Sequence, residues 1–210
     1  QNGKCMDISP ISFKINGNQI YASGCPKPAA HADFRKFLES NNIGTIVMVT
    51  GFKELDKTKC HDYFLPSKQE IVNSENVVYD IDDDDTELKD LHRYRYKVWP
   101  DQGVPQDLAQ FHKFVVDVSE GHNSVSGEKK GILIHCSAGV GRTGVFLMSF
   151  LLYNYLNNKE IIGSTEILDK IRKSINDNNN SDLIDNVANL LSSLRNDRPH
   201  LVQTVGQFEF

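Results

Sequence analysis

The sequence has no apolar run close to the ~20 residues that a membrane-spanning helix requires, so we expect no such helix. It also lacks a basic excess: 23 Lys and Arg stand against 28 Asp and Glu, for a formal net charge of −5. Nucleic-acid-binding domains usually carry the opposite sign, so we expect no nucleic-acid partner. Internal repeats are absent too, and the length suits one domain better than two. We therefore expect a single domain over residues 1–210.

Cysteine is scarce as well. No CxxC pair occurs among the four cysteines, which are Cys5, Cys25, Cys60 and Cys136. Two disulfides could form in principle, but disulfide scaffolds are typical of much smaller secreted domains. The neighbouring His61 and His135 match no zinc-binding spacing. We therefore expect reduced thiols in a reducing, cytoplasmic compartment, and neither a metal nor a cofactor.

Apolar periodicity predicts strands and helices in alternation. Strands are expected over residues 45–50, 77–80, 93–98 and 131–135, and helices over 30–39, 108–119, 141–156 and 183–194. The polar stretch 119–130 is expected to be a surface loop. Strands interleaved with helices indicate an α/β domain, although the order of the strands is left open.

The segment from Ile132 to Gly144, ILIHCSAGVGRTG, carries the clearest chemical signal. An apolar strand ends at Cys136, a loop of small residues follows, and a helix begins near Arg142. The glycines in that loop allow its backbone N–H groups to curl inward and approach a ligand closely. Such a nest at the start of a helix binds a dianion. Arg142 adds a planar fork that binds two phosphate oxygens at once.

The electrostatic field of these N–H groups and of the helix start also acts on the thiol of Cys136. Inward N–H donors and a helix start favour its thiolate form, and a thiolate beside a bound phosphorus is a nucleophile. Thr143 could then donate a hydrogen bond to the sulfur and ease its departure. The alternative is a buried cysteine without a chemical role, which is common in proteins. A glycine-rich turn that ends in an arginine at a helix start is much less common, so the catalytic interpretation is favoured.

Residues His135 to Gly144, HCSAGVGRTG, resemble the active-site loop of the protein tyrosine phosphatases. The resemblance extends from about Asp7 to Phe210 and implies an α/β domain with a central, highly twisted mixed β-sheet flanked by α-helices. It also implies hydrolysis of phosphotyrosine without a metal, in which Cys136 attacks phosphorus and Arg142 holds the phosphate. His135 would support the loop, whose phosphate-binding members would be Ser137, Ala138, Gly139, Val140 and Gly141.

Two further segments resemble other parts of that site. Residues 99–101, Trp-Pro-Asp, are similar to the family's acid loop, which implies that Asp101 protonates the leaving oxygen and later activates water. Trp99 would be a supporting residue behind the site. Residues 195–207 are similar to its glutamine loop, which implies that Gln203 positions the water. By the same resemblance, the supporting residues would be Gln207, Arg195 and Arg198.

Residues 45–60 are similar to a core strand of the family and the segment after it. The resemblance implies that Glu54 orients Arg142, because a guanidinium fork works only when its orientation is fixed. It also implies that Lys59 pairs with the acid loop. Considered without the family, both residues would be ordinary surface charges.

The first residues depart from the family pattern. Residues 4–10 are similar to the loop that recognises phosphotyrosine, and Asp7 is kept as the group that binds the substrate backbone. Cys5 stands where the family has a tyrosine, and loss of aromatic stacking removes on the order of 1 kcal/mol. We therefore expect weaker binding and a looser preference for phosphotyrosine. Residues 10–21 are shorter than in typical members, so part of the N-terminal sheet is expected to be missing.

The expected partners are phosphotyrosine-containing proteins, acted on by a monomer. A phosphotyrosine-binding module with little turnover is an alternative, which Cys5 favours. A phosphatase of relaxed or lipid specificity is another, although lipid phosphatases of this type usually carry basic residues in the loop and residues 137–140 contain none. Oxidation of Cys136 is a further expectation, with Cys60 as a candidate to resolve the resulting sulfenic acid.

Overall fold

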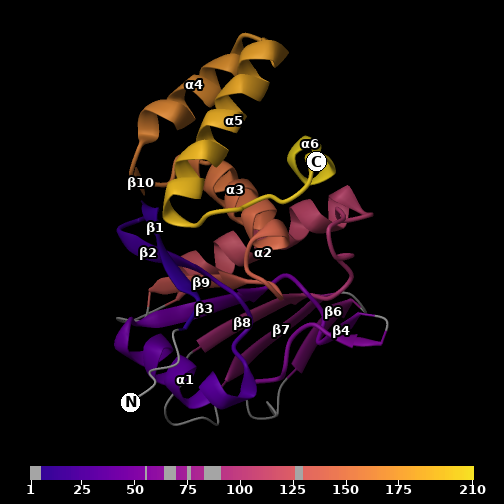
Figure 1. Ribbon diagram of the computed structural model, residues 1–210. Helices are drawn as coiled ribbons and strands as arrows, with labels where there is room; N and C mark the ends of the chain where they lie inside the picture. Colours follow the sequence, from indigo (N-terminus) through magenta and orange to yellow (C-terminus); the bar gives the residue numbers. More distant parts are fainter. Residues whose placement is uncertain (1–5, 55, 64–69, 75–76, 83–90, 126–129) are drawn as a thin grey trace.

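The computed structural model describes residues 6–54, 56–63, 70–74, 77–82, 91–125 and 130–210 (Figure 1). The strands are β1 (Ile8–Ile15), β2 (Asn18–Ser23), β3 (Ile43–Met48), β4 (Lys53–Glu54), β5 (Lys57–Thr58), β6 (Glu70–Ser74), β7 (Val77–Asp82), β8 (Leu91–Tyr96), β9 (Gly131–His135) and β10 (Ile161–Ile162). The helices are α1 (His31–Ser40), α2 (Leu108–Ser124), α3 (Gly141–Leu156), α4 (Thr165–Asn176), α5 (Asn180–Asp197) and α6 (Val205–Glu209), with a 3-10 turn, η1 (Pro28–Ala30), before α1. The expected α/β class is confirmed. Within the described residues, no helix has both the length and the apolar content needed to cross a membrane.

One mixed sheet organises the molecule, with the strand order β10-β1-β2-β9-β3-β8-β7-β6. Its four central strands, β2, β9, β3 and β8, run parallel to one another. The strands at both edges pair antiparallel to their neighbours. β4 and β5 form a separate two-stranded hairpin. The mixed sheet implied by the family resemblance is therefore confirmed.

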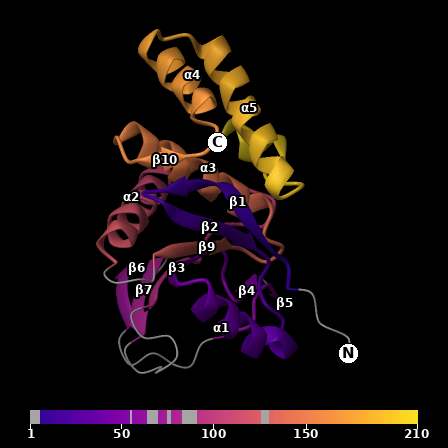
Figure 2. The ribbon, with the colours of Figure 1, turned by 90° about the vertical axis from the view of Figure 1, so that its left-hand side faces the viewer.

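Helices cover both faces of the sheet, with α1 on one face and α2 to α6 on the other (Figures 1 and 2). Side chains alternate between the faces along β3, as the two-residue period of a strand requires. Ile46 and Met48 pack in the cluster that contains Phe34 of α1. Val47 and Val49 pack in the larger cluster with α2 and α3. A strand buried on both faces accounts for the continuous apolar run in the sequence.

Helix α2 is longer than its sequence pattern predicts. It continues through the first part of the stretch 119–130, which was expected to be a loop. Ser119 and His122 lie on its buried face, where Ser119 accepts a hydrogen bond from Asn154 of α3 at 3.0 Å. His122 pairs with Thr45 of β3 at 3.0 Å. The prediction failed because polar residues on the buried face, which form hydrogen bonds across the core, interrupt the apolar periodicity.

The N-terminal strands form a complete hairpin despite the short stretch between residues 10 and 21. The turn is Asn16-Gly17, where both residues have positive φ, at 50° and 77°. This conformation favours Asn followed by Gly in two-residue hairpin turns. Phe13 and Ile15 alternate into the core from β1. The hairpin is therefore specified locally and places the start of the chain beside the central strands.

Candidate active site

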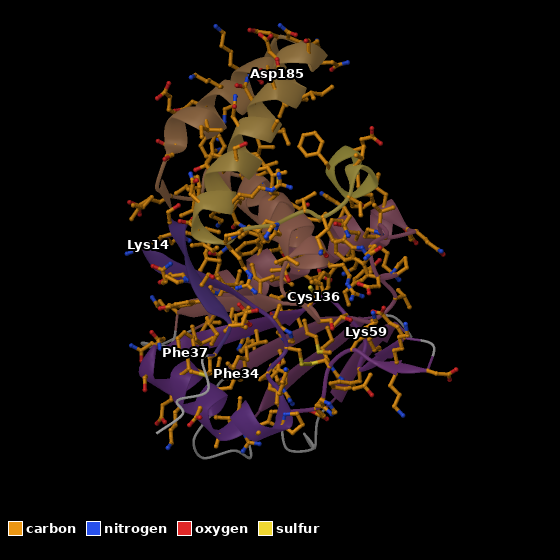
Figure 3. The ribbon with its side chains drawn as sticks, viewed as in Figure 1. Lys14, Phe34, Phe37, Lys59, Cys136 and Asp185 are labelled. Carbon is orange, nitrogen blue, oxygen red and sulfur yellow. A yellow bond between two sulfur atoms is a disulfide. The ribbon has the colours of Figure 1, made fainter. Side chains whose placement is uncertain are left out.

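The four parallel central strands end at the same edge of the sheet, and the candidate site residues follow those ends. Cys136 follows β9 and Cys25 follows β2. The hairpin that carries Glu54 and Lys59 follows β3, and Asp101 lies after β8. Ligand sites of α/β sheets lie at the carboxyl ends of parallel strands. Strand order therefore gathers residues that are far apart in the sequence, and Figure 3 labels two of them, Cys136 and Lys59, near the middle of the molecule.

The loop from Cys136 to Arg142 turns its carbonyl groups outward. The Ser137 carbonyl accepts from the Cys25 N–H at 2.9 Å. The Gly139 carbonyl accepts from Arg198 Nε at 2.6 Å. The Val140 carbonyl accepts the N–H groups of Gly144 and Val202 at 2.9 and 3.2 Å. Because the C=O and N–H of a peptide unit point in opposite directions, these contacts leave the N–H groups available to the interior of the loop.

Gly139 allows the loop to pass close to β2. Its φ is +72°, which glycine adopts readily. A Cβ at this position would lie 2.1 Å from the carbonyl oxygen of Ser23. Only a residue without a side chain fits here, so the predicted role of this glycine in shaping the cradle has a direct steric basis.

The thiol of Cys136 lies inside this loop and is 3% exposed. Its Sγ accepts a hydrogen bond from the Gly139 N–H at 3.2 Å, so at least one loop amide points at the sulfur. The predicted contact from Thr143 is not present: within the described residues, Thr143 Oγ1 is buried and has no hydrogen-bond partner. A role for this hydroxyl in the second step therefore stays a prediction.

Arg142 is held from two sides although only 2% of its surface is exposed. Nη1 donates to Glu54 and also to the Trp99 carbonyl, at 2.8 Å for the latter. Nη2 lies 3.2 Å from Asp101 Oδ1. Thr50 donates to the same Glu54 oxygen at 2.9 Å. The structure thus brings Glu54 and Arg142 together, and it adds Thr50, which the sequence gave no reason to select.

Asp101 lies at the open side of the site with 47% of its side chain exposed. Lys59 donates a hydrogen bond to Asp101 Oδ2, and its ammonium group also lies 3.7 Å from Glu54. The hydrogen bond from Lys59 is the main cause that lowers the pKa of Asp101, and the charge of Arg142 adds to it against the opposing effect of burial. Trp99 anchors this loop by donating to the Gly103 carbonyl at 2.9 Å.

The two predicted glutamines lie against the start of α3. A Cβ on Gly141 would approach Gln203 Oε1 to 2.7 Å, so the Gln203 side chain lies directly over the loop from Cys136 to Arg142. Gln207 is buried, and its Oε1 accepts from the Gln203 N–H at 2.8 Å. Its Nε2 donates to the Gly103 carbonyl of the acid loop at 3.2 Å. Gln207 therefore links the two loops that surround the site.

Asp7 is held in place by Arg198, a pairing across 191 residues that the sequence did not predict. The guanidinium binds both carboxylate oxygens, at 3.0 and 2.7 Å, while its Nε holds the Gly139 carbonyl. Asp7 is thereby fixed at the rim of the catalytic loop with 69% of its side chain exposed. Arg195 donates to the Leu201 and Val202 carbonyls and braces the glutamine segment. Cys5 lies outside the described residues.

Comparisons of the sequence with known proteins identify its family. Residues 6–87 and 71–177 match the sequence profile of the family described as protein-tyrosine phosphatase. The chain belongs to the protein-tyrosine phosphatase family. It is 31% identical to tyrosine-protein phosphatase 2 of Dictyostelium discoideum, over 97% of this chain and 52% of that protein. It is 30% identical to tyrosine-protein phosphatase corkscrew of Drosophila virilis, over 92% of this chain and 26% of that protein.

A third relative of this phosphatase domain carries a different substrate in its name. Phosphatidylinositol phosphatase PTPRQ of Homo sapiens is 28% identical, over 98% of this chain and 8% of that protein. The chain spans about half or less of the length of these curated relatives.

His135 contacts the catalytic loop from within the core. Its Nδ1 lies 3.1 Å from the Cys136 carbonyl oxygen, and its Nε2 lies 2.5 Å from the hydroxyl of Tyr63. Burial lowers the pKa of His135 to about 4, so the imidazole is neutral at physiological pH. Tyr63 was not predicted, because no sequence motif marks a buried tyrosine as the partner of a histidine 72 residues away.

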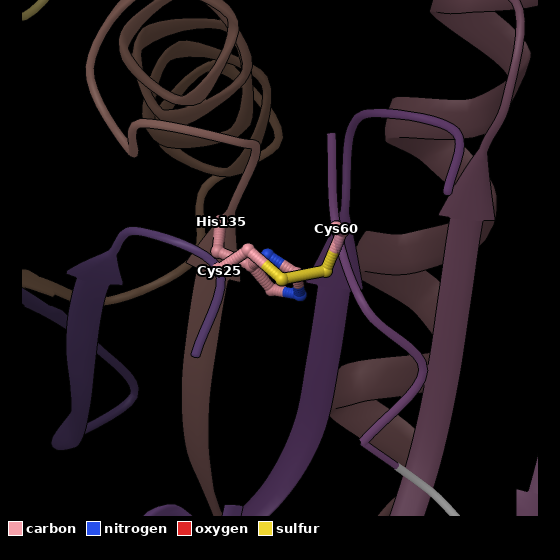
Figure 4. A group of neighbouring side chains, drawn as sticks. All are labelled: Cys25, Cys60 and His135. Atoms are coloured by element: carbon pink, nitrogen blue, oxygen red, sulfur yellow. A yellow bond between two sulfur atoms is a disulfide. The ribbon is translucent and has the colours of Figure 1, made fainter. Parts of the chain in front are cut away.

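The expectation that all four cysteines are reduced was wrong for two of them. Cys25 and Cys60 form a disulfide across a separation of 35 residues. They meet because the segments that follow β2 and β5 lie on either side of the loop that follows β9. Figure 4 shows the bonded sulfurs beside the ring of His135, and the ligand atoms of these three residues lie within 4.8 Å of one another. Among the described cysteines, Cys136 alone is free.

Proposed function

We propose that this domain hydrolyses phosphotyrosine in proteins through a cysteinyl-phosphate intermediate. One observation supports this most strongly: the Cys136 thiol lies inside a loop whose carbonyls face outward, between Arg142 and an acid loop. Phosphate oxygens would take the inward N–H groups and the fork of Arg142, so no metal is required for charge stabilisation. This assignment fits the names of the tyrosine-protein phosphatases to which the chain is similar.

In the first step, the Cys136 thiolate attacks phosphorus and the bond from phosphorus to the tyrosine oxygen breaks. Protonated Asp101 transfers its proton to that oxygen, so the leaving group departs as a phenol. In the second step, Asp101 takes a proton from water, which attacks phosphorus and releases the thiolate. Gln203 lies over the loop, where its amide can position this water.

The pH dependence follows from these protonation states. The first step requires a thiolate and a protonated Asp101 together, so the rate should be bell-shaped. Because Lys59 and Arg142 lower the pKa of Asp101, the fraction of protonated acid declines at lower pH than it would for an unpaired carboxyl. The optimum should therefore lie in acidic solution.

Protein substrates are favoured over lipids by the groups around the loop. Asp7 stands at its rim as an exposed carboxylate fixed by Arg198, placed to accept an N–H from a peptide backbone. A phosphoinositide is the second candidate, since one relative is named a phosphatidylinositol phosphatase. The loop side chains of Ser137, Ala138 and Val140 carry no positive charge for additional phosphates. We further propose that the domain acts as a monomer.

The test uses a phosphotyrosine peptide, a phosphothreonine peptide of the same sequence and phosphatidylinositol phosphates. Turnover should be fastest on the phosphotyrosine peptide. Cys136→Ser should abolish turnover while phosphopeptide binding persists. Asp101→Asn should lower kcat by roughly 10²–10⁴-fold, with little change in affinity and with loss of the basic limb of the pH profile.

Binding without measurable turnover in the unmodified protein would instead identify a phosphotyrosine-binding module. Faster turnover of the lipids would identify the second candidate. An unchanged rate in Asp101→Asn would remove Asp101 from the acid role, and Glu209→Gln, an exposed change at the far end of α6, serves as the matched control.

A further inference from the structure

The Cys25–Cys60 disulfide joins the two segments that flank the catalytic loop. Cys25 follows β2, and its backbone N–H donates to the Ser137 carbonyl at 2.9 Å. Cys60 follows Lys59 in the β4–β5 segment, and the Lys59 carbonyl accepts from Ser137 Oγ at 2.7 Å. Ser137 thus contacts both segments, and the disulfide, which is drawn in Figure 4, joins the same two segments.

Apart from the disulfide, the segment that carries Lys59 is held by apolar packing of Phe52 and Cys60 against the cluster that contains Phe34, and by polar contacts. Its strands pair with each other and not with the main sheet. Lys59 and Cys60 both donate backbone N–H groups to the Phe52 carbonyl, which lies within the same segment. Glu54 contacts Thr50 and Arg142, and Lys59 contacts Asp101 through its ammonium group and Ser137 through its carbonyl oxygen. A covalent bond at Cys60, next to Lys59 in the chain, therefore restricts where the lysine can reach.

We infer that Cys25 and Cys60 are positioning residues for the acid loop: their disulfide holds Lys59 against Asp101, and its reduction to two thiols weakens that contact. The inference rests on the proposed function, because it concerns the acid of the same reaction.

The groups that face Asp101 determine the direction in which reduction of the disulfide changes the pKa of its carboxyl. Lys59 and Arg142 are the two cations beside its carboxylate, and the Gln102 N–H donates a further hydrogen bond. Glu54 forms ion pairs with the same two cations, Lys59 and Arg142, and so acts on Asp101 only through them. Weakening the Lys59 contact leaves Arg142 as the main stabiliser of the ionised form. Asp101 then stays protonated to higher pH, so the basic limb of the profile of rate against pH moves to higher pH.

Common reagents can both reduce the Cys25–Cys60 disulfide and form it again. A small dithiol reduces the bond by exchange: two electrons and two protons pass to the two protein sulfurs, and the dithiol leaves as a cyclic disulfide. A peroxide restores the bond: the two thiols lose two electrons and two protons, and hydrogen peroxide is reduced to two waters. Cys136 is already a free thiol, so reduction by the dithiol leaves it unchanged.

The experiment measures kcat/KM against pH for the protein with the disulfide intact and after reduction by dithiothreitol. Both samples contain a chelator, since the sulfurs and His135 could hold a metal once the thiols are free. Reduction should move the basic limb to higher pH by about 0.5 pH unit or more, because a nearby opposite charge changes a carboxyl pKa by an amount of this order. The double variant Cys25→Ser, Cys60→Ser should match the reduced protein and ignore dithiothreitol.

Lys59→Met provides the control for mechanism. Its basic limb should already lie at the higher position and should not respond to reduction. A merely structural disulfide would change the amplitude of the profile or the fraction folded, but would not move the limb in a Lys59-dependent way. Should the double variant fail to fold, the reduced unmodified protein still decides the matter. An unmoved limb after verified reduction overturns the inference.

A second measurement separates this inference from the proposed function. Carboxyl ¹³C NMR follows the titration of Asp101 in Cys136→Ser, which needs no turnover. An upward shift of the Asp101 titration on reduction supports the inference even when no substrate is hydrolysed. An active enzyme whose Asp101 titrates identically in both redox states contradicts the inference and leaves the proposed function intact.

Discussion

Arg142 supplies the positive charge of the site from a nearly fully buried position. A buried guanidinium is strongly unfavourable unless it is paired and hydrogen-bonded. Glu54, the Trp99 carbonyl and Asp101 supply these partners, and they differ in their function. Glu54 and Trp99 fix the plane of the fork, whereas Asp101 must be free to protonate a leaving group. Orientation of Arg142 therefore depends chiefly on Glu54.

Replacing Glu54 by Gln tests this dependence. The amide keeps the size of the side chain but removes the charged hydrogen bond to Arg142, a contact worth about 1.5–3 kcal/mol. We expect kcat/KM for a phosphotyrosine peptide to fall by roughly 10–100-fold, with vanadate affinity reduced in parallel. Steady-state kinetics and vanadate titration measure the two effects.

Asp56→Asn is the matched control, an exposed carboxylate in the same segment. It should leave both quantities unchanged. Equal kinetics for Glu54→Gln and the unmodified protein would show that Trp99 alone orients the fork.

At the scale of elements, the site is a strand, a loop and a helix in direct succession. β9 is one of the four central parallel strands and is buried along its whole length. α3 is buried over its first turns, from Gly141 to Met148. Both elements are therefore fixed by packing, and the loop between them has little freedom. The N-terminus of α3 also directs its positive end toward the phosphate site.

Gly139→Ala tests whether the loop depends on its close approach to β2. The added Cβ would overlap the Ser23 carbonyl, and the residue would keep a positive φ that disfavours a side chain. The loop must then shift away from β2, which moves the N–H groups that bind phosphate. We expect kcat/KM to fall by about 100-fold or more while far-ultraviolet circular dichroism stays unchanged.

Gly206→Ala is the control for this substitution, because a Cβ there meets no atom within 4 Å and the position is helical. Its activity should equal that of the unmodified protein. Full activity in Gly139→Ala would show that the loop tolerates displacement from β2.

At the scale of the whole molecule, two buried imidazoles couple folding to pH. His122 lies between α2 and β3, and His135 lies at the end of β9. Burial is the main cause that lowers both pKa values to about 4. Each imidazole is therefore neutral in the folded protein over a pH range in which the unfolded chain binds a proton.

The free energy of unfolding should fall as the pH is lowered through this range. The unfolded imidazoles bind protons near pH 6.5, the folded ones only near pH 4, so protonation favours the unfolded chain between those values. Above pH 6.5 the contribution is flat. Each histidine contributes up to about 3 kcal/mol, which urea denaturation at pH 7.5 and pH 5 would measure.

His122→Gln should remove about half of this pH dependence, because it eliminates one of the two protonations. An exposed histidine, His112, serves as the control, and His112→Gln should leave the slope unchanged. A free energy of unfolding equal at both pH values would show that the buried histidines accept protons without unfolding.

Local segments were the ones that the sequence predicted well. The segment 131–156 was predicted as strand, loop and helix with the observed bounds, because its pattern is contiguous. The extension of α2 was missed, since Ser119 and His122 hide its buried face from any apolar count. The hairpin of β1 and β2 was not predicted, although its Asn-Gly turn is a local signal.

Contacts between distant segments could be anticipated only where the family resemblance assigned them. Glu54 and Arg142 are 88 residues apart, and the resemblance paired them correctly. It assigned separate roles to Asp7 and Arg198, and the structure joins them across 191 residues. It gave no indication that Cys25 and Cys60 meet.

The sequence by itself determined the catalytic loop, because that loop is made from consecutive residues whose conformation follows from glycine, a strand end and a helix start. The tertiary structure decided the partners of the loop. The parallel order of β2, β9, β3 and β8 brings four strand ends to one edge, and this order depends on long-range packing that no local pattern records.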